Sequence, residues 1–253
     1  MKRTLTSLLL AGATLASLAL AAPAFASPRQ AIVFQDDGHV VTQNSVVRNA
    51  TLDEMQRLGA TVVKVNLQWQ LIAPRNRPRD PSRPGDYNWA AYDAAVADIR
   101  AKGMRPWLMF GHPRVPRWAS RNGENDNVKT REFELFVRAA GRHFDGSAGP
   151  RVDLWSVWNE PNLPNWLKPQ RFRGTTPLSP SVYRKLYLAA HRALSSTGHG
   201  RDTILIGELF SGGSGPKFRR VRIGPLEFLR EMACLDSSYR PYRGRAARAR
   251  GCG

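Results

Sequence analysis

Two polar residues follow a hydrophobic run in the middle of the sequence. Residues 152–158 read Val-Asp-Leu-Trp-Ser-Val-Trp, and Asn159, Glu160 and Pro161 come next. Proline has no N–H group to donate to a sheet, so the strand predicted over residues 152–158 ends at this point. A carboxylic acid beside tryptophan rings can have its pKa raised by desolvation, as a general acid working near neutral pH requires. The pattern predicts that Glu160 is a catalytic proton donor and that the Asn159 amide holds a substrate hydroxyl.

The segments on either side supply the elements that would position this pair. Residues 61–67 are rich in valine, as in a buried parallel strand, and residues 130–143 carry apolar side chains on one helical face. The predicted strands are residues 31–35, 61–67, 105–110, 152–158 and 203–207, and the predicted helices are residues 51–58, 89–102, 130–143, 181–196 and 226–235.

Local signals mark where several of these helices begin and end. Thr51 with Glu54 fits a capping box, which would start the first helix at residue 51. Gly59 supplies the left-handed residue that ends this helix, and two later helices stop at Gly103 and Gly198.

Alternation of strand and helix predicts an α/β fold with a parallel sheet whose faces are covered by helices. A doubly wound sheet would need a glycine-rich phosphate turn after its first strand, which this sequence lacks. The glycine-rich residues 212–215 instead follow the fifth strand and lack the Lys-Ser/Thr pair of a P-loop. Long loops after the second, third and fourth strands favour a (β/α)8 barrel of the TIM-barrel type, with about five βα units in this chain.

The sequence resembles clan A glycoside hydrolases, the (β/α)8 retaining enzymes that include families 5 and 39. In that clan an Asn-Glu pair, often Asn-Glu-Pro, ends the fourth strand and its Glu is the acid/base, a pattern that residues 159–161 match. The wider run 150–170, with Tyr183 and Arg184, is similar to secreted bacterial cellulase-like members, and the similar pattern covers about residues 32–252. The resemblance implies a retaining O-glycosyl hydrolase that acts on β-linked glycosides or polysaccharides and needs neither a metal nor an organic cofactor.

Further clan positions carry over to other predicted strand ends. Many members have an arginine on the second strand that hydrogen-bonds the nucleophile. Lys64 stands at this position here. A lysine keeps the positive charge of arginine but cannot form its two parallel hydrogen bonds to a carboxylate. His112 resembles a sugar-contacting histidine of the clan, or is a structural loop residue. Asp36 and Asp37 end the first strand and are expected to reach the site, with Asp37 and Glu208 as substrate ligands.

Several tryptophans fall in predicted loops or at strand ends, where an aromatic ring can stack on a sugar face. Each ring taken alone is equally well explained by packing in the core. The predicted sugar-binding rings are Trp69, Trp118 and Trp158, with Trp166 as a further candidate.

Retaining hydrolysis needs a second carboxylate about 5–5.5 Å from the first, which acts as the nucleophile. In the clan this residue ends the seventh strand, and no residue of this sequence matches it. Glu208 is the comparably placed acid, as a substrate ligand or, less favoured, a substitute partner for Glu160. At about 40 residues a unit, roughly 120 residues of an eight-unit barrel are missing. We therefore expect a fragment, or the product of an interrupted gene, with little or no activity.

The charge balance is strongly basic, at +18 for 253 residues, with 31 Arg and 7 Lys. The excess is spread along the chain, as codon bias in a GC-rich genome would produce, rather than gathered in a patch that indicates nucleic-acid binding. The exception is residues 240–250, which hold five arginines. We expect a carbohydrate partner and no nucleic acid. The second interpretation is a non-catalytic carbohydrate-binding barrel, and the third a basic extracellular protein that binds polyanions.

The N-terminus reads as a secretory signal peptide over residues 1–26. Lys2 and Arg3 precede an apolar run, and residues 24–26 form the small-x-small cleavage site Ala-Phe-Ala. Thr and Ser interrupt the apolar run, which argues against a membrane anchor. We expect a secreted, extracellular, monomeric protein with one domain over residues 27–253 and no membrane contact after cleavage.

The two cysteines, Cys234 and Cys252, lie close together near the C-terminus. Their spacing matches no common zinc pattern. In an oxidising compartment such a pair predicts one disulfide, which stabilises the fold by about 3 kcal/mol in the chain-entropy model.

Overall fold

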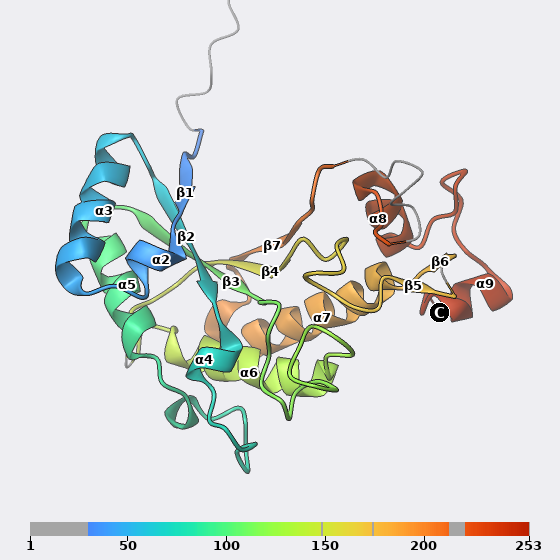
Figure 1. Ribbon diagram of the computed structural model, residues 1–253, viewed down its shortest axis with the longest axis horizontal. Helices are drawn as coiled ribbons and strands as arrows, with labels where there is room; N and C mark the ends of the chain where they lie inside the picture. The colour runs from blue at the N-terminus through green and yellow to red at the C-terminus, as the bar shows by residue number, and fades with distance from the viewer. Residues whose placement is uncertain (1–29, 148, 174, 213–220, 253) are drawn as a thin grey trace, which may run out of the picture. The chain divides into compact units, whose positions relative to one another are not determined.

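Five parallel strands, each beside the one before it in the chain, form the main sheet of the protein, described here from a computed structural model (Figure 1). The structure describes residues 30–147, 149–173, 175–212 and 221–252, so the predicted signal peptide, residues 1–26, lies outside the described residues. The strands are β1 (Val33–Gln35), β2 (Val62–Leu67), β3 (Arg105–Phe110), β4 (Leu154–Asn159) and β7 (Thr203–Glu208), in the order β1-β2-β3-β4-β7.

The strand order distinguishes the two predicted architectures. A doubly wound sheet reverses its strand order at a switch point, whereas this sheet grows in one direction, as a (β/α) barrel does. Register pairs such as Asn159 with Glu208 place the carboxyl ends of neighbouring strands at one edge of the sheet. The predicted α/β fold with a parallel sheet of barrel type is therefore confirmed.

Helices return the chain from one strand to the next along one face of the sheet (Figure 1). These are α3 (Ser45–Arg57), α5 (Ala90–Ala101), α6 (Thr130–His143) and α7 (Ser179–Leu194), and α8 (Pro225–Met232) follows β7. Shorter elements are α2 (Asp37–Val40), α4 (Trp69–Ile72), the turns η1 (Pro84–Asp86) and η2 (Ser195–His199), α9 (Gly244–Ala249), and a hairpin of β5 (Arg171–Phe172) and β6 (Thr176–Pro177). Among the described ranges, no helix combines the length and apolar character that a bilayer crossing requires.

The core between sheet and helices is rich in aromatic rings. On β4, the Trp155 indole stacks on Phe110 with ring centroids 5.2 Å apart, and Trp69 stacks on Phe136 of α6 at 4.7 Å. All four side chains are at most 2% exposed. Burying a large apolar side chain stabilises a fold by about 1.5–3 kcal/mol, so these rings fix α6 and the sheet against each other.

Most predicted elements form within a few residues of their predicted ends. The strand at residues 105–110 and the helix at residues 130–143 have the predicted bounds. Gly59, Gly103 and Gly198 have φ angles of +85°, +73° and +89°. The glycines predicted to end helices therefore adopt the left-handed conformation that this role requires.

The predicted start of the first helix is wrong. Helix α3 begins at Ser45, because the Asn44 side-chain oxygen accepts hydrogen bonds from the N–H groups of Val46 and Val47 at 3.0 and 3.1 Å. Thr51 lies inside the helix, where its hydroxyl donates to the Val47 carbonyl. Asparagine is among the strongest N-cap residues. Asn44 therefore starts the helix at Ser45, six residues before the capping box predicted at Thr51 (51 minus 45).

Cys234 and Cys252 form the predicted disulfide, with their Cα atoms 5.7 Å apart. The bond ties the end of α8 to the residues that follow α9. The prediction of one disulfide is confirmed.

Asn44→Ala should lower the free energy of unfolding by about 1 kcal/mol, because two N–H groups at the helix start lose their acceptor. Thr51→Ala is the matched control and should cost about 0.5 kcal/mol or less, since the Thr51 hydroxyl bonds a carbonyl inside the helix. Urea titration followed by tryptophan fluorescence measures both. A loss in Thr51→Ala as large as that in Asn44→Ala would contradict the Asn44 cap.

Candidate functional site

The backbone turns sharply where β4 ends. Trp158 and Glu160 have φ angles of +65° and +40°, a region that costs a non-glycine residue about 1–3 kcal/mol and is enriched at functional sites. Gly111, at the end of β3, permits this path, because a Cβ atom there would lie 2.8 Å from the Trp158 backbone. The Glu160 N–H donates to the Glu208 carbonyl oxygen at 2.8 Å. Two acidic residues therefore lie side by side at the ends of β4 and β7.

A buried ion pair joins β2 to β7. The Lys64 ammonium donates to Oε2 of Glu208 and lies 5.4 Å from the centroid of the Trp107 ring. The side chain of Lys64 is 7% exposed and that of Glu208 is 28% exposed. Oε1 of Glu208 is buried and accepts no hydrogen bond from a described residue. The pair holds the Glu208 carboxylate in place and leaves one buried acceptor at the strand ends.

The same ion pair shows that the sheet is curved. Strands β3 and β4 lie between β2 and β7, and the strand register places Lys64 level with Thr203, five residues before Glu208 (208 minus 203). In a flat sheet the two backbones would be separated by about 14 Å across the strands and about 16 Å along them. No lysine and glutamate can bridge that distance. The contact requires the curvature and stagger of a barrel wall.

Asp37 links the ends of β1 and β2. Its Oδ1 accepts from the Asn66 N–H at 2.7 Å, and its Oδ2 accepts from the Gln35 amide at 3.1 Å. Burial raises the pKa of the Asp37 carboxyl, and these hydrogen bonds and the charges of Lys64 and His112 oppose the shift. Asp37 therefore lies within electrostatic reach of the buried lysine and of the predicted sugar-contacting histidine.

His112 is half-buried just after β3. Burial lowers the pKa of its imidazole, and the Asp37 charge opposes this shift. Its Nδ1 accepts from the Arg114 N–H at 3.3 Å, and its ring lies edge-on to Trp166, with centroids 6.3 Å apart. With Nδ1 as an acceptor, the neutral ring carries its proton on Nε2, which can donate to a ligand hydroxyl.

Two of the predicted sugar-binding rings are wrong, because they lie in the core. Trp69 is 2% exposed, and Trp158 is fully buried with its Nε1 donating to the Trp166 carbonyl at 2.6 Å. Trp118 is half-buried, lies edge-on to Trp69 at 5.5 Å and donates to the Pro74 carbonyl at 3.3 Å, so it packs against the core as well. Stacking on a sugar needs an open ring face, which Trp69 and Trp158 do not offer.

Asp36 does not join Asp37 at the site. Its carboxylate caps α2, where it accepts from the His39 N–H at 3.0 Å and pairs with the His39 imidazole at 2.7 Å.

Asn66 of β2 is a further polar residue at the site that the sequence patterns do not predict. Its Oδ1 is buried without a partner among the described residues. The available signal is that Asn66 is polar within a valine-rich strand.

The structure thus brings several predicted residues together at the carboxyl ends of the strands. Glu160 and Glu208 touch through the backbone, Lys64 binds Glu208, and Asp37 lies within reach of Lys64 and His112. Asn159 is paired in register with Glu208. Carboxylates, an amide and an imidazole are suited to proton transfer and to binding hydroxyl groups. In the described part of the chain, no group of three or more His, Cys, Asp or Glu side chains could hold a metal ion.

Comparison with known proteins gives partial matches to glycosidases. No family model matches the chain. Beta-glucosidase 47 of Arabidopsis thaliana is 33% identical over 114 residues, which are 44% of this chain and 20% of that protein. A glucosidase from Croceicoccus marinus is a solved structure with 22% identity and a TM-score of 0.48, covering 72% of this chain and 37% of its own. A monomeric beta-xylosidase from Caulobacter crescentus CB15 has 17% identity and a TM-score of 0.49, covering 74% of this chain and 37% of its own.

The chain therefore spans a fifth of the curated relative and just over a third of each solved chain. By their names, these three proteins are glycosidases. The narrower resemblance to families 5 and 39 stays a prediction.

Lys64→Met should lower the free energy of unfolding by about 3 kcal/mol or more, because Glu208 then keeps a largely buried charge without a cation. Lys64→Met/Glu208→Gln should recover most of that loss, since neither charge remains. Lys102→Met breaks the more exposed pair with Asp53 and, as the matched control, should cost no more than about 1 kcal/mol. Urea titration measures all three, and a Lys64→Met loss no larger than the control's would show that the ion pair is not buried as described.

Proposed function

We propose that this chain carries the proton donor of an active site that hydrolyses O-glycosyl bonds in β-linked glycosides or polysaccharides. The observation that carries the proposal is the position of Glu160, which follows Asn159 at the carboxyl end of β4 and lies beside Glu208. In (β/α) barrels this end of the strands builds the active site. The 114-residue similarity to the Arabidopsis beta-glucosidase supports the substrate class.

In the retaining, double-displacement reaction that we propose, Glu160 acts twice. Its carboxyl donates a proton to the glycosidic oxygen as the bond to the sugar breaks. Its carboxylate then takes a proton from the water that hydrolyses the glycosyl intermediate. A positioned acid of this kind contributes roughly 10²–10⁴-fold to the rate.

The other strand-end carboxylates are better suited to binding sugar hydroxyls than to nucleophilic attack. Glu208 lies on the strand next to Glu160 and would approach a sugar from the same side, whereas the nucleophile attacks the face opposite the leaving oxygen. Asp37 already accepts hydrogen bonds from Asn66 and Gln35. We therefore assign both as substrate ligands, together with Asn159 and His112, and expect the chain alone to turn over substrate slowly or not at all.

The site of action in this proposal is outside the cytoplasm. Residues 1–26 have the pattern of a secretory signal peptide. The disulfide between Cys234 and Cys252 is of the kind that forms and persists in oxidising compartments. Both features support secretion.

If an added nucleophile attacks the sugar, the contribution of proton donation to the rate can be measured on its own. With sodium azide supplying the attack, Glu160→Gln should release phenol from phenyl β-glucoside roughly 10²–10⁴-fold more slowly than the parent chain, because phenolate leaves poorly without a proton. Release from 2,4-dinitrophenyl β-glucoside should change by less than about threefold, since this leaving group needs no proton. The measurement is the initial rate of phenol release at fixed azide concentration.

Glu124→Gln removes an exposed loop carboxylate and, as the matched control, should leave both rates unchanged. Equal losses on the two glycosides in Glu160→Gln would show that Glu160 is not the proton donor. If cellotriose binds in an NMR titration but neither glycoside is cleaved, even with azide, the alternative of a non-catalytic carbohydrate-binding barrel is favoured instead.

A further inference from the structure

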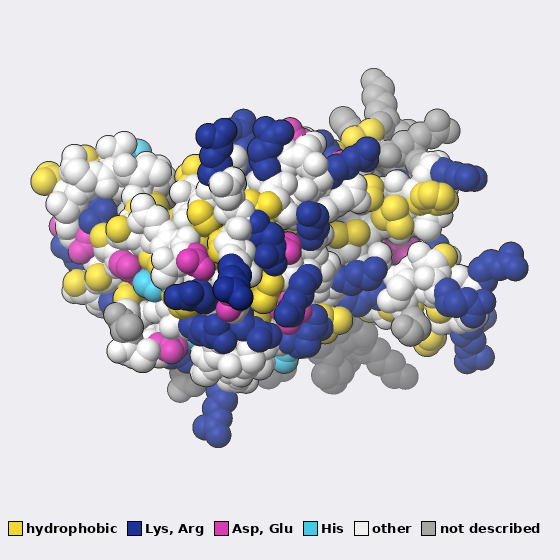
Figure 2. All heavy atoms as spheres, turned by 90° about the horizontal axis from the view of Figure 1, so that it is seen from below, with side chains coloured by type: hydrophobic (Ala, Val, Ile, Leu, Met, Phe, Trp, Pro, Cys, Tyr) yellow, Lys and Arg dark blue, Asp and Glu magenta, His cyan; other side chains and the backbone are white. Residues whose placement is uncertain are grey.

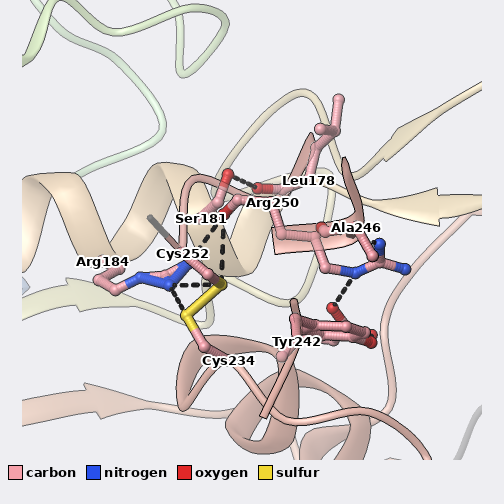
Figure 3. Close-up of a disulfide and its surroundings, with 9 residues drawn as sticks. Leu178, Ser181, Arg184, Cys234, Tyr242, Ala246, Arg250 and Cys252 are labelled. Carbon is pink, nitrogen blue, oxygen red and sulfur yellow. Dashed lines mark hydrogen bonds and ion pairs between the residues drawn. A yellow bond between two sulfur atoms is a disulfide. The ribbon is translucent and has the colours of Figure 1, made fainter. Parts of the chain in front are cut away.

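The C-terminal segment, residues 234–252, is held in a fixed arrangement beside α8. A disulfide closes it, and Glu231 of α8 accepts hydrogen bonds from the Tyr242 hydroxyl at 2.7 Å and from Nε of Arg250 at 2.9 Å. Figure 3 shows the Arg250 side chain next to Tyr242, and the guanidinium carbon lies 4.2 Å from the centroid of the ring. The segment therefore presents a defined surface.

Most of the positive charge on this segment is not neutralised. It contains five arginines and one acidic residue, Asp236. Arg250 is paired with Glu231. Four arginine side chains form no hydrogen bond or ion pair with any residue that the structure describes: Arg240, Arg243, Arg245 and Arg248. Figure 2 shows Lys and Arg side chains projecting at the right-hand end, which α8 and α9 occupy in Figure 1.

A hollow of about 700 Å³ opens on this segment, lined by Asp236, Arg240, Pro241, Tyr242, Arg243 and Ala246. Oδ1 of Asp236 accepts from the backbone N–H groups of Arg240 and Ser238 at 2.9 and 2.8 Å, and these bonds hold the pKa of its carboxyl below the usual range. The charge of Arg230 acts on the same carboxylate, and Nε of Arg230 is buried without a partner among the described residues. The hollow combines cationic, apolar and anionic walls.

We propose that this hollow binds a short acidic oligosaccharide of the uronate class. Arg240 and Arg243 present planar guanidinium forks, which match a carboxylate with two parallel hydrogen bonds. Pro241 and Tyr242 supply an apolar wall for a sugar ring, and the Asp236 carboxylate accepts from sugar hydroxyls. The volume lies within the range of small-ligand pockets.

The same groups disfavour a nucleic acid. A single strand is bound through a row of phosphates and through several aromatic platforms. Among the described residues that line it, the hollow offers one aromatic ring, Tyr242, with Arg250 against it, so it lacks the several platforms on which successive bases stack. A uronate carries a carboxylate and several hydroxyls on each ring, which fits two arginines beside one aspartate. The hollow uses none of the strand-end residues, so this binding site goes beyond the proposed hydrolase.

Isothermal titration of trigalacturonate into the 253-residue chain tests the inference. Arg240→Gln/Arg243→Gln should weaken binding by about tenfold or more, because both carboxylate forks are lost. Arg245→Gln/Arg248→Gln removes the same charge from positions that do not line the hollow and should weaken binding by less than about threefold. Affinity should fall as the salt concentration rises from roughly 50 to 200 mM.

Equal losses in the two double variants, or no binding by the parent chain, would overturn the inference. Tighter binding of a dT strand of roughly 15 nucleotides than of trigalacturonate would assign the surface to nucleic acid instead. Glu160→Gln should bind trigalacturonate as the parent does, and a loss there would move the site to the strand ends. Failure of Glu160 as a proton donor leaves this inference intact. Circular dichroism and thiol titration check that each variant keeps its fold and its disulfide.

Discussion

The geometry of the site depends on the buried ion pair between Lys64 and Glu208. Because the two residues belong to strands separated by two others and are staggered by the register, the pair can form only on a curved, sheared sheet. That curvature draws the carboxyl ends of β1, β2 and β7 toward one another. The side chains at those ends, Asp37 among them, therefore share one electrostatic environment. An open, flat sheet with the same strands would leave them apart.

Packing beneath the strand ends supports the strained backbone above them. Trp155 is fully buried against Phe110 on the helix-covered side of β4, so the strand is rigid up to the point where Trp158 and Glu160 adopt positive φ. Gly111 makes room for that path at the neighbouring strand. The acid thus directly follows a rigid strand, and sites supported by strands or helices place their side chains more precisely than sites on long loops.

Sequence patterns predict the elements of this fold better than the contacts of individual side chains. The valine-rich residues 61–67 predict β2, because a strand buried on both faces is apolar throughout. The exceptions, Lys64 and Asn66, mark the site, but their partners depend on the curvature of the sheet, which no local spacing encodes. Trp69 and Trp158 fail because of packing, which local spacing also does not encode. Trp69 begins α4 and Trp158 lies in β4, and both rings pack against aromatic side chains of α6.

The most direct measurement of the central claim is the position of Glu160 relative to a bound substrate. In a crystal structure of the chain with phenyl β-glucoside, we expect a carboxyl oxygen of Glu160 within about 3 Å of the glycosidic oxygen, the reach of a general acid. Asn159 and Glu208 should contact sugar hydroxyls in the same complex. A glucoside bound at the strand ends with the Glu160 carboxyl turned away from its glycosidic oxygen would contradict the account.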